Sequence, residues 1–207
     1  MTASHVVVIA VGAGILFLPA LIGVRCLTKA RQLLRWRRPS LKGLDGQRAA
    51  LRGQVRMSDP VKDRTPGDCL WSRELVRRHI VGYKSSSMET VSDLARKAKF
   101  SIVIDGLECV IADLPTQVYG ALATRARNAD RSVYTYWLPV VDYLTVLGWV
   151  RQKGSRWEIV QDPKVGLIYS RHPAESTALR EIVKGGLLLA LVGAGVWAFY
   201  LILESIR

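Results

Sequence analysis

Two long apolar stretches without charged residues dominate the hydropathy pattern of the chain. They cover Val6–Val24 and Gly185–Leu203, each 19 residues long, and a helix of about 20 apolar residues crosses the ~30 Å hydrocarbon core of a bilayer. The first stretch lacks the layout of a cleaved signal peptide, because no Lys or Arg precedes it and Arg25 follows it directly. The pattern therefore predicts two transmembrane helices.

Between these stretches the pattern changes to short runs that are typical of strands. Apolar and polar residues alternate over Leu51–Met57. Phe100–Leu114 holds Asp105-Gly106 between two β-rich runs, as a two-residue hairpin requires. Pairing across that turn places six apolar side chains on one face: Phe100, Ile102, Ile104, Leu107, Cys109 and Ile111. We therefore expect one face of this hairpin to lie in the core.

The remaining middle region divides into predicted loops and strands. A Ser-rich loop is expected at Lys84–Thr90, and a polar excursion without strands is expected at residues 115–132. Strands are expected at Tyr134–Leu138 and Tyr143–Val150, where β-branched and aromatic residues are frequent.

Two further short runs and a helix start complete the predicted fold. Trp157–Val160 and Val165–Ser170 are expected to pair as a hairpin around Asp162-Pro163, and a helix is expected to begin after His172. The predicted fold class is a membrane-anchored α+β protein, in which two transmembrane helices flank a small mainly-β domain. The predicted segments are a transmembrane helix (1–27), a basic juxtamembrane segment and linker (28–50), the β-rich domain (51–173), and a juxtamembrane helix with the second transmembrane helix (174–207).

Positive charge beside the apolar stretches predicts the orientation. Seven basic residues follow the first stretch within residues 25–42, and Arg171, Arg180 and Lys184 precede the second. On the other side only Arg207 is basic, so the count is ten against one. Because basic residues mark the cytoplasmic side of a span, both termini are predicted to be extracytoplasmic and the middle domain cytoplasmic.

Membrane lipids are a predicted partner for a basic segment that contains an indole. Arg35, Trp36, Arg37 and Arg38 follow one another directly. Basic residues near an anionic membrane surface contribute about 1 kcal/mol each to binding, and tryptophan is enriched at the membrane–water interface. These four residues are therefore candidates for contact with lipid headgroups.

The strongly basic composition does not indicate nucleic-acid binding. The chain has 30 Lys and Arg against 17 Asp and Glu, a net charge of +13. Ten of the basic residues stand beside the apolar stretches, where membrane topology accounts for them. No RNA-binding signature or zinc finger occurs. The sequence therefore predicts no nucleic-acid partner.

No constellation of residues in the sequence indicates catalysis, a cofactor or a metal. The three histidines are far apart in the sequence, and none of Cys26, Cys69 and Cys109 belongs to a C-x-x-C pair. Asp105 is explained by the turn, and Glu108 is expected opposite Val103 on the wetter face of the hairpin. Trp149 and Trp157 are instead candidates for contact with a partner protein, although both also fit an ordinary core.

The order of several short motifs resembles the GIDE family, whose extramembrane part is also called the BAM (beside-a-membrane) domain. The matching stretches are Leu51–Val55, Ser58–Pro60, Cys69–Arg73, Phe100–Leu114, Leu147–Val150 and Gly166–Pro173. The resemblance covers about 150 residues and implies that Leu70–Tyr83, which has no clear period, is a strand. The best-known members are mitochondrial and chloroplast E3 ubiquitin ligases, whose RING domain follows the second span. Only four residues follow that span here, so ligase activity is not carried over.

The sequence thus predicts an integral membrane protein that recognises a partner without catalysing a reaction. The main hypothesis is a GIDE/BAM-like interaction or scaffold module that binds a protein partner or lipid headgroups. One alternative is a small accessory or assembly subunit of a respiratory, photosynthetic or transport complex. A second is a component of a ubiquitin-ligase-like system without a RING. In the mitochondrial ligases the domain faces the intermembrane space, which is opposite to the orientation that the charge count predicts.

Overall fold

A computed structural model describes residues 3–61, 67–81, 86–128 and 130–205 of the chain. The first two residues of the predicted loop at Lys84–Thr90 lie outside these ranges. The helices are α1 (Ala3–Arg35) and α2 (Ala174–Ser205). The strands are β1 (Gln47–Asp59), β2 (Cys69–Val81), β3 (Ser86–Lys97), β4 (Lys99–Ile104), β5 (Leu107–Ile111), β6 (Gln117–Tyr119), β7 (Leu122–Arg127), β8 (Arg131–Pro139), β9 (Tyr143–Lys153), β10 (Arg156–Val160) and β11 (Ile168–Ser170).

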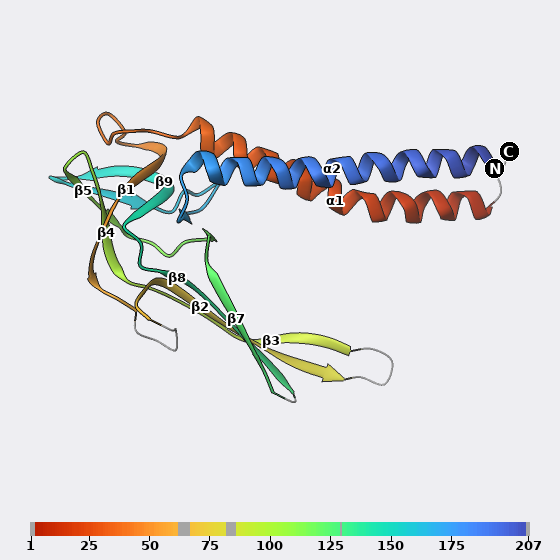
Figure 1. Cartoon of the computed structure of the whole chain (residues 1–207), viewed down its shortest axis with the longest axis horizontal. Coiled ribbons are helices and arrows are strands. Elements are labelled where there is room, and N and C mark those ends of the chain that lie inside the picture. The colour runs from red at the N-terminus through yellow and green to blue at the C-terminus, as the bar shows by residue number, and fades with distance from the viewer. Residues whose placement is uncertain (1–2, 62–66, 82–85, 129, 206–207) are drawn as a thin grey trace. The chain divides into compact units, whose positions relative to one another are not determined.

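The chain forms two compact units, a helical unit and a β unit that spans Trp36–Ala174. Within the helical unit, α1 and α2 run antiparallel (Figure 1). Two glycines let their backbones approach, since a Cβ on Gly185 would lie 2.9 Å from the carbonyl oxygen of Gly23. Farther along, a Cβ on Gly195 would lie 2.8 Å from Leu16 Cδ2. Small residues at a helix–helix contact permit this close packing.

The prediction of two transmembrane helices around a small β domain is wrong. In the described part of the chain, only one helical segment, Ala174–Ile202, is long and apolar enough to cross a membrane. The part of α1 whose side chains are described, residues 16–35, carries Arg25, Lys29, Arg31 and Arg35, and each charge is costly in hydrocarbon. The β part is also not small, since its strands form two sheets and one of these closes into a barrel.

Five strands of the larger sheet close into a barrel. They follow one another around it as β1-β4-β5-β10-β9, and β9 pairs back with β1 over Gln47–Gln54. Within this ring the contact between β5 and β10 is parallel, while the other four are antiparallel. Counted along the chain, the barrel order is therefore first, second, third, fifth, fourth. This Greek-key order is that of an OB-type barrel.

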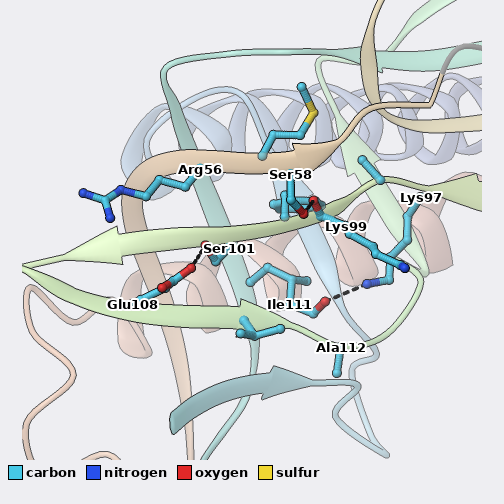
Figure 2. Close-up of a pocket in the computed structure, with 12 residues that line it drawn as sticks. Arg56, Ser58, Lys97, Lys99, Ser101, Glu108, Ile111 and Ala112 are labelled. Atoms are coloured by element: carbon cyan, nitrogen blue, oxygen red, sulfur yellow. Dashed lines mark hydrogen bonds between the residues drawn. The ribbon is translucent and has the colours of Figure 1, made fainter.

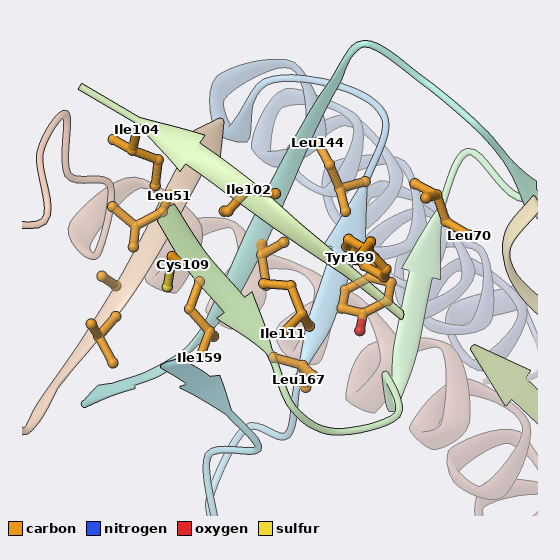
Figure 3. Packing of buried hydrophobic residues seen from close by; sticks show 14 of the residues in the cluster. Leu51, Leu70, Ile102, Ile104, Cys109, Ile111, Leu144, Ile159, Leu167 and Tyr169 are labelled. Carbon is orange, nitrogen blue, oxygen red and sulfur yellow. The ribbon is translucent and has the colours of Figure 1, made fainter. Parts of the chain in front are cut away.

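Inward-facing apolar side chains fill the barrel (Figure 3). Ile102, Ile111, Leu144 and Ile159 are all fully buried. The ring of Tyr169 stands edge-on to Phe100, with 5.7 Å between the ring centroids, and its hydroxyl donates a hydrogen bond to the carbonyl of Asp113. Burial also raises the pKa of this tyrosine, so the hydroxyl remains a hydrogen-bond donor within the core.

The hairpin predicted at Phe100–Leu114 is confirmed in its turn and its register. Asp105 and Gly106 have φ values of 50° and 78°, as a type I′ turn requires. Ile102 pairs with Cys109, and Ile104 pairs with Leu107. All six side chains of the predicted apolar face are buried except Leu107, which is exposed beside the turn.

Other strand predictions need correction. Residues 115–132 are not a strand-free excursion but contain β6, β7 and the start of β8, and Ser86–Thr90 belongs to β3 rather than to a loop. The segments β10 and β11 do not pair with each other, because both pair with β9, β10 along residues 149–153 and β11 along residues 145–147. Long-range pairing decides these elements, and the local pattern does not report it.

The second sheet has four strands in the order β3-β2-β8-β7. It is made by two excursions from the barrel, one between β1 and β4 and the other between β5 and β9 (Figure 1). Every described side chain of β7 is exposed, and those of β3 are exposed or half-buried. Much of this sheet therefore lacks a covering layer on either face.

Candidate functional site

A cleft in the β unit lies on the outer surface of barrel strands β1, β4 and β5. Side chains that alternate with the barrel core point into it: Arg56 and Ser58 from β1, Lys99 and Ser101 from β4, and Glu108 and Val110 from β5. The end of β3 adds Lys97 (Figure 2). Its volume is about 680 Å³, which falls within the size range of ligand-binding pockets.

Three hydrogen bonds fix the polar groups of the cleft. Ser101 Oγ donates to Glu108 Oε1 across the β4–β5 pair at 2.5 Å. Ser58 Oγ donates to the carbonyl of Lys99 at 3.1 Å. Lys97 Nζ donates to the carbonyl of Ile111 at 2.6 Å (Figure 2). These bonds hold one cation and one carboxylate in defined positions.

The balance of charge in the cleft is positive. Arg56, Lys97 and Lys99 face one carboxylate, that of Glu108. Burial lowers the pKa of Lys97, and the charge of Asp113 partly opposes this effect. Partly buried cations attract an anionic group more strongly than fully solvated ones, because water screens them less. The cleft is therefore suited to an anionic ligand group.

The lining of the cleft combines serine hydroxyls and charged groups with apolar surface. Among its described residues there is no His and no Cys, so neither serine hydroxyl has the imidazole base that nucleophilic catalysis uses. In the described ranges no three His, Cys, Asp or Glu side chains gather as a metal site would require. Val110, Met57 and Ala112 add apolar surface beside the cations.

The predicted residues Trp36 and Trp149 both lie beside Arg48 on another part of the β unit. The guanidinium carbon of Arg48 lies 5.3 Å from the centroid of the Trp36 ring and 5.8 Å from that of Trp149. Arg48 Nε also donates to the buried carboxylate of Asp162. The carbonyl of Trp36 accepts a hydrogen bond from Ala50 at 2.7 Å. Both indoles thus have contacts that stabilise the barrel.

The other predicted contact residues are spread along the chain. Arg35 is the last residue of α1, and the exposed side chains of Arg37 and Arg38 follow it. Trp157 lies on β10, opposite Gln152 of β9, and packs half-buried against the core. None of these residues lines the cleft. Their contact with headgroups or a partner protein stays a prediction.

The cysteines are buried, as the hairpin pattern predicts for Cys109. Cys26, Cys69 and Cys109 belong to no disulfide bond in the described part of the chain, and they have little or no exposure. Burial raises the pKa of the Cys109 thiol to about 12, and the charge of Glu158 adds to this shift. A thiol with so high a pKa carries almost no nucleophilic thiolate at neutral pH.

Sequence reasoning missed the residues that line the cleft. Arg56, Lys99 and Glu108 belong to three strands, and only the pairing of β1 with β4 and of β4 with β5 brings them together. The alternation of polar and apolar residues along β4 and β5 carried part of the signal, since the polar set faces outward. The sequence pattern does not give the register of β1 against β4, and this register brings Arg56 to the cleft.

Comparison with known proteins adds no name to this arrangement, since no family model, curated protein or solved structure matches the chain. The resemblance to the GIDE family therefore stays a prediction. The observations define a class of protein at a coarser level: an OB-type barrel with a second, open sheet, on a chain that carries one candidate membrane span.

Proposed function

We propose that this chain is a non-enzymatic binding module held at a membrane by α2, and that its barrel cleft receives an acidic segment of a partner protein. The observation that carries this proposal is the composition of the cleft. Three cations and several apolar residues line it, together with a single carboxylate. The GIDE-like motif order, in which a β domain beside a membrane recognises a partner, agrees with the proposal.

The form of the cleft favours a polypeptide segment. It runs across three strands, so its cations are distributed along a groove and do not converge on one point. Val110, a residue that is 38% exposed, lies beside them. An extended segment with carboxylates and small apolar side chains satisfies both kinds of surface. Opposite charges at the rim chiefly fix specificity and the rate of association.

Reversing two cleft cations is expected to abolish most partner binding. With a photo-crosslinking residue at Val110, the chain in its native membranes should give a discrete adduct, identified by mass spectrometry through an acidic crosslinked segment. The double variant Arg56→Glu with Lys99→Glu should reduce the adduct by about tenfold, which corresponds to ~1.4 kcal/mol of binding free energy.

The matched control reverses two exposed cations elsewhere on the barrel. Lys153→Glu with Arg156→Glu changes the charge of the paired ends of β9 and β10, which lie outside the cleft. This variant should retain the adduct. An adduct that is absent from the parent protein, or that both double variants reduce equally, would count against the cleft as the binding site.

We also propose that the β unit lies on the cytoplasmic side of the membrane. Arg171, Arg180 and Lys184 stand at the end of α2 that joins this unit, and short basic flanks mark the cytoplasmic side. A Thr124→Cys variant, at an exposed site of β7, should react with an impermeant maleimide only after right-side-out vesicles are permeabilised. Glu204→Cys, at the other end of α2, should react without permeabilisation, and the reverse pattern would overturn the orientation.

A further inference from the structure

The four-stranded sheet has one face that gathers basic and aromatic side chains. In the ladder, Arg77 of β2 pairs with Ser132 of β8, and Arg127 of β7 pairs with the same serine from the other side. Leu75 and Arg125 flank Tyr134 in the same way. Because paired residues share a face and the side chains alternate, one face carries the set Arg77, His79, Arg125, Arg127, Tyr134 and Tyr136. We call it the basic face.

Contacts within the basic face hold its charges in place. The ring centroid of Tyr134 lies 5.6 Å from the guanidinium carbon of Arg77 and 5.2 Å from that of Arg125. His79 Nε2 lies 3.3 Å from Ser132 Oγ. Stacking on an aromatic ring orders an arginine while leaving its N–H groups available.

The charge of this face is largely uncompensated. Its carboxylate, Asp93, is engaged by the neighbouring Arg73 through two bonds of 2.7 and 2.5 Å. In the part of the chain that the structure describes, no ion pair holds Arg77, Arg125 or Arg127. Arg125 and Arg127 are exposed along the edge strand β7. The face therefore carries a surplus of three guanidinium groups, of which those of Arg125 and Arg127 are exposed and that of Arg77 is half-buried.

The opposite face of the same strands differs in the side chains that it carries. It carries Leu94, Val76, Val133 and Leu122 at register positions that alternate with the basic set. Its basic residues include Arg96 and the cross-strand partners Arg78 and Arg131, and Arg131 lies 3.6 Å from Asp130. The arrangement of arginines beside Tyr134 and Tyr136 is thus a property of one face.

We infer that the basic face binds an anionic phospholipid surface. Guanidinium groups form bidentate hydrogen bonds with phosphates, and tyrosine beside arginine is typical of the membrane–water interface. A second copy of the chain is a poor occupant, since the net charge of +13 makes two basic faces repel. The chain also carries a candidate span, so the inference rests on the proposed attachment to a membrane, where headgroups are the most abundant anions.

The test uses the full chain reconstituted in nanodiscs of phosphatidylcholine alone. The probe is a separate vesicle of equal parts phosphatidylcholine and phosphatidylserine, and binding is measured by co-flotation at physiological salt. The parent protein should bind these vesicles and not vesicles of pure phosphatidylcholine. Each basic residue at an anionic surface contributes about fivefold to binding, so Arg125→Gln with Arg127→Gln should weaken it about 25-fold.

The matched control neutralises two charges on the opposite face of the same sheet. Arg78→Gln with Arg131→Gln should weaken vesicle binding by less than about fivefold, because the Debye length of ~8 Å screens the far face. Equal losses of vesicle binding in the two double variants would show that only the net charge of the protein matters. This result would overturn the inference. Stronger binding of polyglutamate or single-stranded RNA than of the vesicles would also overturn it, in favour of an acidic protein or a nucleic acid. Loss of crosslinking at the barrel cleft tests the partner segment separately, so the two proposals fail by different measurements.

Discussion

Replacing Asp162 by alanine is expected to lower the free energy of unfolding of the β unit by about 3–5 kcal/mol. Its carboxylate is fully buried and accepts from Arg48 Nε. It also accepts from the backbone N–H groups of Lys164 at 2.7 Å and Val165 at 3.0 Å. The variant leaves two backbone donors without this acceptor and a half-buried guanidinium without its charge partner. Chemical denaturation of the full chain in micelles, followed by tryptophan fluorescence, measures the loss.

An exposed ion pair four residues away provides the control. Arg151 Nε donates to Glu158 Oε2 at 2.9 Å on the outer surface of β9 and β10. Exposed pairs contribute about 0–1 kcal/mol, so Glu158→Ala should change stability by no more than that. Similar losses in Glu158→Ala and Asp162→Ala would contradict a specific role for Asp162.

The same carboxylate makes stability depend on pH. Burial by itself would raise the pKa of Asp162, but the hydrogen bonds from Arg48, Lys164 and Val165 outweigh burial and lower the pKa below its ordinary value. A carboxyl whose pKa is lowered in the folded state stabilises the fold above its unfolded pKa of about 3.9. This contribution is lost as the pH falls further, through the folded pKa. The stability of Asp162→Asn, which removes the charge but keeps one side-chain acceptor, should fall less steeply in this range.

Substituting Gly148 with alanine is expected to lower the free energy of unfolding by about 3 kcal/mol, the upper end of the usual cost of overpacking. A Cβ at this position would lie 2.6 Å from Ile159 Cγ2 and 2.7 Å from Leu167 Cδ1. It would also lie 2.7 Å from the carbonyl oxygen of Val160, which belongs to the neighbouring backbone. The barrel has to expand at β9 and β10 to admit one methyl group. Denaturation of the full chain measures this change as well.

A glycine in open space separates crowding from the loss of glycine itself. Gly106 stands at the β4–β5 turn with φ of +78°, and nothing lies within 4 Å of a Cβ there. Asparagine adopts this left-handed conformation more readily than other residues with a Cβ, so Gly106→Asn should cost less than about 1 kcal/mol. If Gly148→Ala lowers the free energy of unfolding as little as Gly106→Asn does, the barrel accommodates the added methyl group at little cost, and the prediction is wrong.

The local hairpin was the part of the fold that the sequence predicted best. Asp105-Gly106 specifies its turn, and the turn sets the register of every pair along β4 and β5. Local residue patterns also explain why the strands predicted at Tyr134–Leu138 and Tyr143–Val150 are correct. These residues lie within β8 and β9. Neighbouring residues contain the information needed for these elements.

The errors concern elements that depend on distant parts of the chain. β7 is polar and exposed, and only its pairing with β8 makes it a strand. Trp157 and Ile159 were assigned to a hairpin with β11, whereas their strand pairs in parallel with β5. In the same way the first apolar run of α1 predicts a span, although the last part of this helix is basic. Long-range pairing and packing decide these elements, and the local sequence pattern does not report them.

The candidate sites were even less accessible to sequence reasoning. The cleft needs the β1–β4 register, and the basic face needs the alignment of β2, β8 and β7. Arg125 and Arg127 do alternate as residues of a strand would, but a segment interpreted as irregular gave no reason to assign them to one face. Charge is visible in a sequence, whereas its concentration on a surface follows from pairing.

The closure of the barrel through β1 and β9 also has a consequence for synthesis on the ribosome. Ala49 pairs with Gly148, so β1 leaves the exit tunnel long before the strand that seals its other edge. Until then the nascent β1 has an unpaired edge, which can pair with other extended chains. Folding domains generally form as units during translation, and here the barrel is complete only after β10. A chain stalled before β9 would leave the edge of β1 free to pair with neighbouring chains.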